Sequence, residues 1–403
     1  MPLPTPLTML CLASYRKGDA FLCQAKREGA RVLLLTSKSL EGADWPRECL
    51  DDIFYIPDVD KAWKMEDAIK GVSYLARTTK IDRIVALDDF DVEKAAALRE
   101  HLRIPGMGDT TARYFRDKLA MRTRARDAGL DAPEFIHVLN YDDLRAFLAS
   151  VPAPWVLKPR LMAGAIGIKK LHSADEFWRT VEALGDEQAS YLLERFVPGD
   201  VYHADSIVGD YKILFAIASR YGTPPLQVAH EGRVFTTCTL RRGSSEERAV
   251  LDMNSRLLEA FGYKRGISHS EFIRTADGKL YFLETSARVG GAHIVDLVEA
   301  ATGLNLWAEW ARLEARREGE PYTVSPPREL NAGLMVSLAR QEWPDLSRYD
   351  DPEVVWRLKK KNHAGLIVAS PDAQRVEWLL ASYSERFYQD FFASAPPRDR
   401  PMD

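Results

Sequence analysis

The sequence has few cysteines and no pattern that would bind zinc. Its four cysteines, Cys11, Cys23, Cys49 and Cys238, are scattered over 403 residues without a C-x-x-C pair. Sparse cysteines without regular spacing are typical of reduced, mostly buried thiols, so we expect neither a zinc finger nor a disulfide framework. They also favour a cytoplasmic protein, because the cytosol keeps thiols reduced.

Long apolar runs are also absent. The apolar stretch near the start, TMLCLAS, is too short to span a bilayer, and no basic segment precedes it. We therefore expect it to be a first buried strand, and we expect no membrane partner.

Neither sign of charge dominates the chain. It has 55 Lys and Arg against 59 Asp and Glu, for a net charge of −4. Proteins that bind nucleic acid usually carry a basic surface, so we expect no nucleic-acid partner. A chain of this length exceeds one hydrophobic core, which predicts two or three domains.

The first hundred residues alternate strand-like and helix-like segments. Their runs of Val, Ile and Leu, bounded by Gly, Pro and Asp, predict a doubly wound parallel sheet. Ligands bind beyond the carboxyl ends of such strands, which places Ser14, Thr36, Asp88 and Asp89 at a cleft, although ordinary turn residues and helix N-caps look the same in sequence. No G-x-G-x-x-G follows the first strand, and this argues against a dinucleotide-binding Rossmann domain.

A single helix is expected next. Asp109 or Thr110 can cap its start and Gly129 can close its end. Lys118 then lies in the middle of this helix. Taken alone, it would be an exposed helix lysine.

The segment PWVLKPRLMAGAIGIKKL predicts a hairpin with a flexible connection. Gly164 and Gly167 would let backbone N–H groups close over phosphates, and Lys158 would supply a positive charge. Many hairpin loops carry two glycines without binding anything, so this motif leaves both interpretations open.

The region after the hairpin reads as two antiparallel strands over 201–221, a polar loop over 222–243, and a helix near 246–261. His230 and Arg233 in the loop are candidate contacts for a substrate carboxylate, although a solvated loop is the alternative. Pro326 and Pro327 mark a boundary before a small α+β lobe.

Two neighbouring segments, ISHSEF at 267–272 and LYFLETSARVGGA at 280–292, combine acidic and basic side chains. Strand alternation puts His269 and Glu271 on one face, and Glu284, Ser286 and Arg288 on one face. Paired carboxylates beside a cation suit a hard divalent metal that carries nucleotide phosphates. The alternative is an ordinary hairpin, turning at 276–278, with its charges in solvent.

In their order along the chain, these motifs resemble the ATP-grasp superfamily. Within it they resemble the carboxylate–amine ligases, including L-amino acid ligases and biotin carboxylase-like proteins. The resemblance implies a multidomain α/β and α+β fold. A Rossmann-like parallel sheet, the pre-ATP-grasp domain, would span 1–105. An ATP-grasp domain with two α+β lobes would span 106–330, with its lid at about 133–193, and a small α+β lobe would span 331–403.

The resemblance also implies a nucleotide site for ATP. Lys118 and Lys158 would hold the phosphates, and the loop with Gly164 and Gly167 would form the lid above them. The hinge that pairs with adenine would consist of Glu194, Arg195, Phe196 and Val197. His203 would meet the ribose.

At the other end of the site, the resemblance implies that Glu271 and Glu284 hold Mg²⁺, with Mn²⁺ as an alternative. Arg288 would stabilise an acyl phosphate and its tetrahedral successor, with Lys158 beside it. Ser286 replaces an asparagine that usually helps to hold a second metal ion, so one-metal and two-metal sites both remain open. His269 would contact the substrate or only hydrogen-bond to Glu271.

We therefore expect an ADP-forming ligase that activates a carboxylate as an acyl phosphate and couples it to an amine, with amino acids as substrates. One alternative is a biotin carboxylase-like or other ATP-dependent carboxylating enzyme, but no biotinylation lysine flanked by methionines is present. Another is a non-catalytic nucleotide-binding protein. Dimerisation is usual among the resembled enzymes, and the sequence leaves a homodimer open.

Overall fold

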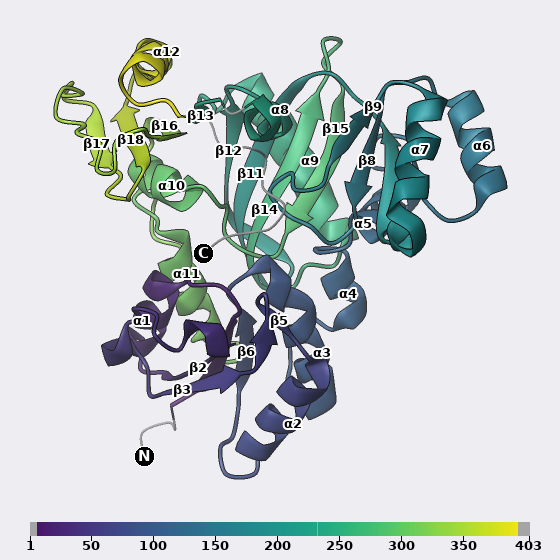
Figure 1. Ribbon diagram of the computed structural model, residues 1–403. Helices are drawn as coiled ribbons and strands as arrows, with labels where there is room; N and C mark the ends of the chain where they lie inside the picture. Colours follow the sequence, from purple (N-terminus) through teal and green to yellow (C-terminus); the bar gives the residue numbers. More distant parts are fainter. Residues whose placement is uncertain (1–5, 232, 394–403) are drawn as a thin grey trace.

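The computed structural model describes residues 6–231 and 233–393, and its longer strands form three sheets. Figure 1 shows the N-terminal sheet at the bottom, a small sheet with two helices at the right, and a large sheet at the top centre that continues into the C-terminal lobe at the upper left.

The N-terminal sheet is parallel throughout, in the order β3-β2-β1-β6. Its strands are β1 (Thr8–Ala13), β2 (Arg31–Ser37), β3 (Asp52–Ile56) and β6 (Arg83–Ala86), and its helices are α1 (Asp19–Arg27), α2 (Met65–Leu75) and α3 (Val92–Leu102). A two-residue pair, β4 (Asp58–Val59) and β5 (Ala62–Trp63), lies outside this sheet.

Both faces of β1 are buried, as the apolar run TMLCLA predicts. Met9 and Cys11 share a core with Phe21 of α1 and Trp310 of the distant helix α11 (Leu306–Glu314). Leu10 and Leu12, on the other face of β1, pack in a second core with residues of α2 and α3. The predicted doubly wound sheet is confirmed, although one of its covering helices comes from far along the chain.

The single helix predicted from Asp109 onward is wrong. The structure has a short α4 (Asp109–Arg113) and a separate α5 (Lys118–Asp127). Asp117 caps α5 by accepting a hydrogen bond from the Leu119 N–H, and it also pairs with Arg160. Lys118 is therefore the first residue of α5 rather than a mid-helix lysine, and its side chain turns inward.

The small sheet has the order β7-β10-β8-β9 and contains the predicted hairpin, β8 paired antiparallel with β9. Its strands are β7 (Phe135–His137), β8 (Trp155–Pro159), β9 (Lys169–Leu171) and β10 (Tyr191–Arg195). Helices α6 (Tyr141–Ser150) and α7 (Ala174–Leu184) complete this unit around a core of its own.

The large sheet has eight strands in the order β15-β14-β11-β12-β13-β16-β18-β17. They are β11 (Asp200–Gly209), β12 (Lys212–Tyr221), β13 (Phe235–Thr239), β14 (Gly266–Arg274), β15 (Leu280–Ser286), β16 (Asn331–Leu338), β17 (Val354–Arg357) and β18 (His363–Ser370). The sheet continues from β13 to β16, so the predicted C-terminal lobe shares a sheet with the strands before it. The domain division at residue 330 stays a prediction.

The helices associated with this sheet are α8 (Pro225–Glu231), α9 (Ser245–Ala260), α10 (Ile294–Thr302) and α12 (Ala373–Asp390). The polar loop predicted over 222–243 is therefore wrong, because α8 and β13 lie within it. Helix α9 packs against the face that carries Tyr202, Ala204 and Phe272. Alternation along β11 and β14 then turns His203, His269 and Glu271 to the opposite face.

The cysteines do not all behave as predicted. Cys23 of α1 and Cys49 form a disulfide across a Cα–Cα distance of 4.7 Å. They are 26 positions apart in the sequence, so no short motif predicts the disulfide. Only the packing of α1 against the segment after β2 brings the two cysteines together. Cys11 and Cys238 are free thiols.

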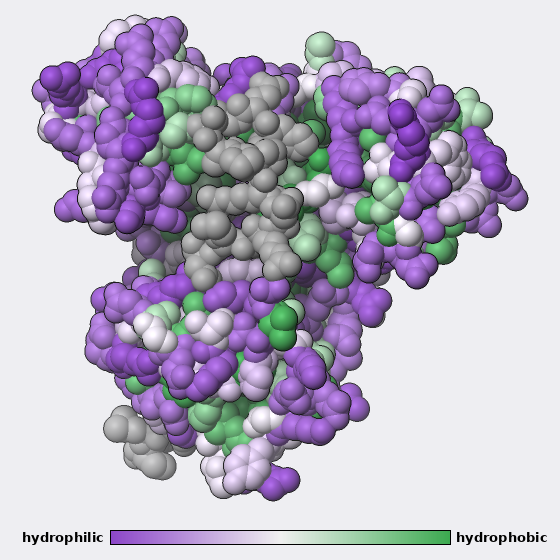
Figure 2. Space-filling view, viewed as in Figure 1, coloured by the Kyte–Doolittle hydropathy of each residue, from purple (hydrophilic) through white to green (hydrophobic). Residues whose placement is uncertain are grey.

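Within the described residues, no helix has the length and apolar character needed to cross a membrane. Figure 2 shows a largely hydrophilic surface over the N-terminal sheet, the α6–α7 unit and the C-terminal lobe.

Candidate active site

A cavity of about 840 Å³ lies where the large sheet, the small sheet and the N-terminal sheet meet. Most of the predicted site residues line it, namely Lys118, Lys158, Gly164, Glu194, Arg195, Phe196, Val197, His269, Glu271, Glu284, Ser286 and Arg288. Gly167 and His203 are not among the residues that line it. The fold therefore brings together side chains from α5, β8, β10, β14 and β15.

The β14–β15 hairpin forms the floor of the cavity. Glu271 and Glu284 lie directly opposite one another across the two strands, and the turn at Gly278 has a φ of 85°. Because α9 covers the other face of the sheet, the hairpin charges face the cavity rather than solvent. The alternative of an ordinary solvent-facing hairpin is excluded.

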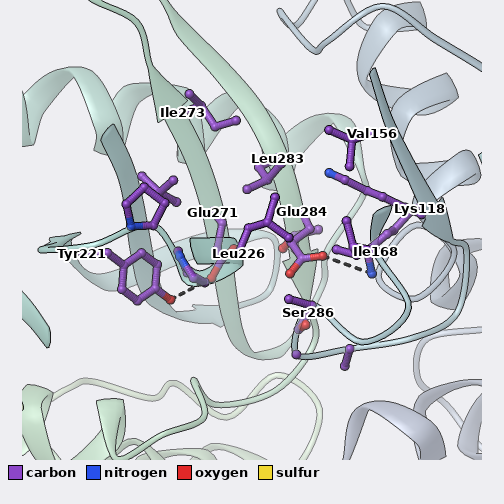
Figure 3. A pocket seen from close by; sticks show the side chains of 18 of the residues that line it. Lys118, Val156, Ile168, Tyr221, Leu226, Glu271, Ile273, Leu283, Glu284 and Ser286 are labelled. Carbon is purple, nitrogen blue, oxygen red and sulfur yellow. Dashed lines mark hydrogen bonds and ion pairs between the residues drawn. The ribbon is translucent and has the colours of Figure 1, made fainter. Parts of the chain in front are cut away.

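Each floor carboxylate has a partner from another element. Lys118 Nζ lies 3.1 Å from Glu284 Oε2, and the Tyr221 hydroxyl donates to Glu271 Oε1 at 2.7 Å (Figure 3). Burial by itself would raise the pKa of the Glu284 carboxyl, but Lys118 and Lys158 outweigh it and lower that pKa. Glu284 is therefore held ionised.

A buried ion network joins the small sheet to α5. Glu194 of β10 accepts bonds from Lys158 of β8 and from Arg122, whose Nη2 lies 2.9 Å from Glu194 Oε2. Burial lowers the pKa of Lys158 and Arg122 lowers it further, while Glu194 opposes both effects. The Glu194 carboxylate thus pairs with two cations. The adenine contact predicted for the backbone of Glu194 stays a prediction.

Arg288 lies just past the end of β15 and reaches the N-terminal sheet. Its Nε donates to Asp89 Oδ2 at 2.6 Å, and its Nη1 donates to the Val289 carbonyl. Burial raises the pKa of Asp89, but Arg288 and Arg116 lower it to about 2. Asp89 follows β6 and lines the cavity. The residue predicted to face a cleft at this strand end is therefore the partner of Arg288.

His203 does not lie where the ribose contact was predicted. It is fully buried, and its ring nitrogens bond to Asp205 Oδ2 and Thr237 Oγ1, both at 2.8 Å. Asp205 also holds His269, whose Nδ1 lies 2.9 Å from Asp205 Oδ1. His203 shares a sheet face with Glu271, but Asp205 and Thr237 hold both of its ring nitrogens, and the structure does not place it among the residues that line the cavity.

His269 differs from His203 in lining the cavity. Its Nε2 lies 3.4 Å from Glu271 Oε1. Burial lowers the pKa of His269, but Asp205 and Glu271 raise it to about 10. His269 is therefore a cation beside the floor carboxylates, which favours the hydrogen-bonding interpretation and leaves substrate contact as a prediction.

The glycine-bearing loop between β8 and β9 covers one side of the cavity. Gly164 and Ala165 line it with φ values of 68° and 62°. Gly167 turns away, and a Cβ there would meet the Pro159 ring at 2.9 Å. Lys118 Nζ donates to the Met162 carbonyl at 2.5 Å, so this loop rests on the same lysine that pairs with Glu284.

Sequence reasoning missed four side chains of this network, namely Arg116, Arg122, Asp205 and Tyr221. The spacing of His203 and Asp205 on one strand face could have indicated Asp205. Arg122 stands four residues after Lys118 on α5, a spacing too common to indicate a role. The side chain of His230 lies outside the described residues, and Arg233 is exposed.

Comparison with known proteins gives a consistent result. No family model matches the chain. An L-arginine-specific L-amino acid ligase of Bacillus subtilis is 25% identical over 363 residues, which cover 84% of this chain and 86% of the relative. A D-alanine–D-alanine ligase of Cupriavidus metallidurans is 26% identical over 217 residues, which cover 52% of this chain and 66% of the relative.

The crystal structure of an L-amino acid ligase from Bacillus licheniformis superposes with a TM-score of 0.76 at 16% identity, covering 98% of this chain and 100% of that one. The predicted resemblance to the ATP-grasp superfamily is confirmed. The predicted ATP-grasp architecture and the predicted class, a carboxylate–amine ligase that forms C–N bonds, are both confirmed.

Proposed function

We propose that this ATP-grasp ligase activates the carboxylate of an amino acid with ATP, couples it to the amine of a second substrate, and releases ADP and phosphate. The observation that carries the proposal is the convergence of Lys118, Lys158 and Arg288 on the opposed pair Glu271 and Glu284 in one cavity. Amino acids as substrates follow from the relatives, whose names state ligases of arginine and alanine.

The reaction has two steps. A carboxylate oxygen attacks the γ-phosphorus of ATP, and the bond from that phosphorus to ADP breaks. The amine nitrogen then attacks the acyl carbon, phosphate leaves with the electrons of the C–O bond, and the amine loses a proton. Both transition states gather negative charge on oxygen, so fixed cations in a cavity with little water are what the chemistry needs.

The three cationic side chains reach the cavity from different elements of the fold. Lys158 and Lys118 approach from the small sheet and α5, where phosphates would lie, and Arg288 approaches from the N-terminal side, where the acyl oxygen would lie. Each is already held by a carboxylate or carbonyl partner. Little reorganisation is then required as charge develops, which is the condition for effective electrostatic stabilisation.

Glu271 and Glu284 are suited to a divalent cation. They oppose each other, one oxygen of each has a protein partner, and the Ser286 hydroxyl follows Glu284 on the same strand face. Mg²⁺, or Mn²⁺ in its place, would neutralise phosphate oxygens there when bound. A serine ligates a second ion less strongly than an asparagine carbonyl, so we infer one firmly held metal ion.

The adenine would lie at the other end, against the hinge backbone at 194–197. Phe196, Val156 and Leu283 supply apolar surface there. The small sheet, 133–193, would act as the lid, as the proposed domain division implies.

Turnover with defined substrates tests the proposal. The pure protein is incubated with Mg-ATP and pools of amino acids, and ADP, phosphate and conjugate masses are followed. We expect ADP release that depends on an amino acid, together with a dipeptide or amide. Bicarbonate-dependent release without a conjugate would replace the proposal with a carboxylating enzyme, and AMP with pyrophosphate as products would overturn it.

A further inference from the structure

Beside Glu271 the cavity is lined mainly by apolar side chains, with the polar Gln227 among them. This apolar wall consists of Tyr221, Pro224, Leu226, Val228, Phe235 and Ile294. Figure 3 shows Tyr221 on one side of Glu271, and Lys118, Val156 and Ile168 on the other. Tyr221 therefore lies on the side of Glu271 away from Lys118.

The one hydroxyl in this wall is already used. The Tyr221 hydroxyl donates a hydrogen bond to Glu271 Oε1 at 2.7 Å. Its ring lies 5.6 Å from the ring of Phe235 and 4.8 Å from that of His203. The phenol is thereby fixed, and what it offers to a ligand is the ring.

Among the described residues, every carboxylate that lines the cavity has a partner. Asp89 pairs with Arg288, Glu194 with Lys158 and Glu284 with Lys118, while Glu271 accepts from Tyr221. A cationic side chain placed here would lose its hydration and find no free carboxylate. An apolar side chain would lose nothing and would gain contact area.

We propose that the amino acid whose carboxylate is activated has an apolar side chain, of about the size of leucine or phenylalanine, and that this side chain lies against the apolar wall. The inference rests on the proposed function. Tyr221 contacts Glu271, so an amino acid whose carboxylate lies beside Glu271 and Glu284 would have its side chain near Tyr221. This chain therefore differs in side-chain preference from its arginine-specific relative.

Competition between amino acids tests the inference. Leucine, phenylalanine, arginine and glutamate are each supplied with Mg-ATP and one common amine, and the conjugate is identified by mass and by its N-terminal residue. We expect kcat/KM for leucine or phenylalanine to exceed that for arginine by at least about tenfold, the scale on which hydrophobic pockets discriminate. Equal or better use of arginine or glutamate would overturn the inference.

Substitution of one residue of the apolar wall tests whether this wall sets the side-chain preference. Leu226→Asp should lower kcat/KM for leucine by about tenfold or more and raise that for arginine, because it supplies a free carboxylate. Val355→Asp is the matched control, since Val355 is 55% exposed on β17 and far from the cavity in sequence and sheet order. Leu226→Ala, which adds no charge, should lower the leucine value without raising the arginine value.

The possible failures are distinguishable. If no amino acid stimulates ADP release, the proposed function fails. If release occurs and the folded Leu226→Asp and Leu226→Ala variants both keep the wild-type preference, only the assignment of the apolar wall is overturned.

Discussion

The two ends of the cavity are built differently. At the charged end, Lys118, Lys158, Glu284 and Arg288 each contact an oppositely charged group on a different element. At the apolar end, the wall consists of packed side chains from β12, α8, β13 and α10, with one hydrogen bond to the floor. Ion pairs and hydrogen bonds fix the positions of the charged groups at one end, whereas packing at the other end limits only the shape of the ligand side chain that fits. Changes at the charged end should therefore abolish turnover, and changes at the apolar end should redirect it.

The largest effect is expected at the floor. Glu284→Gln keeps the shape of the side chain but removes the charge, and it should lower kcat by about 10²- to 10³-fold, by analogy with loss of one transition-state donor. Arg288→Ala should have an effect of the same size. Circular dichroism should show that Glu284→Gln is folded, and steady-state ADP release gives the rate. Turnover that survives in both variants would contradict the site assignment.

The buried network offers a matched pair of variants. Lys158→Met and Arg122→Met each leave Glu194 with one cation instead of two, so each should lower the free energy of unfolding by about 3 kcal/mol. Only Lys158 lines the cavity, so only its loss should also weaken ATP binding. Urea denaturation and calorimetric titration with an ATP analogue measure the two effects. An equal loss of ATP affinity in Arg122→Met would show that the network acts as one unit.

A smaller effect should appear in the pH dependence of stability. The folded-state pKa of Asp89 is about 2, below its unfolded value of about 3.9. Its contribution, about 2 kcal/mol, is therefore present above pH 4 and lost as the pH falls through 2. Asp89→Asn should be less stable than wild type at pH 7, and the difference should shrink at pH 3. Urea unfolding at pH 3, 5 and 7 checks this, and a constant difference would contradict it.

The smallest effect is expected at the hinge. Lys170 Nζ lies 3.7 Å from the centroid of the Phe196 ring, but Lys170 is exposed. An exposed cation–π contact contributes about 0.5–1 kcal/mol, so Lys170→Met should change ATP affinity less than about fivefold. A loss above tenfold would mean that Lys170 contacts the nucleotide directly and belongs to the charged end.

Much of the charged end could be predicted because its signals are local. Period-two alternation places Glu271 and Glu284 on one sheet face, and the Thr275–Lys279 turn then brings them opposite each other. Lys158 lies on a short strand entering a glycine loop. These features depend only on neighbours along the chain. Prediction failed where side-chain partners decided the outcome. Asp205 and Thr237 hold both ring nitrogens of His203, and Asp117 caps a second helix where one helix was predicted.

The apolar end could not be predicted. The segment 222–243 reads as a polar loop, yet it contains α8 and β13, because β13 completes a sheet between β12 and the distant β16. The Cys23–Cys49 disulfide is a similar case, since only packing brings the two sulfur atoms together.

The sequence by itself therefore determined the parallel N-terminal sheet, the hairpin with its two opposed glutamates and the order of the two cavity lysines, because alternation and turn residues act over a few positions. The tertiary structure alone decided the partner of each charge, the orientation of His203 and the apolar wall. Those depend on contacts between elements that lie far apart in the chain, and neither propensity nor spacing encodes them.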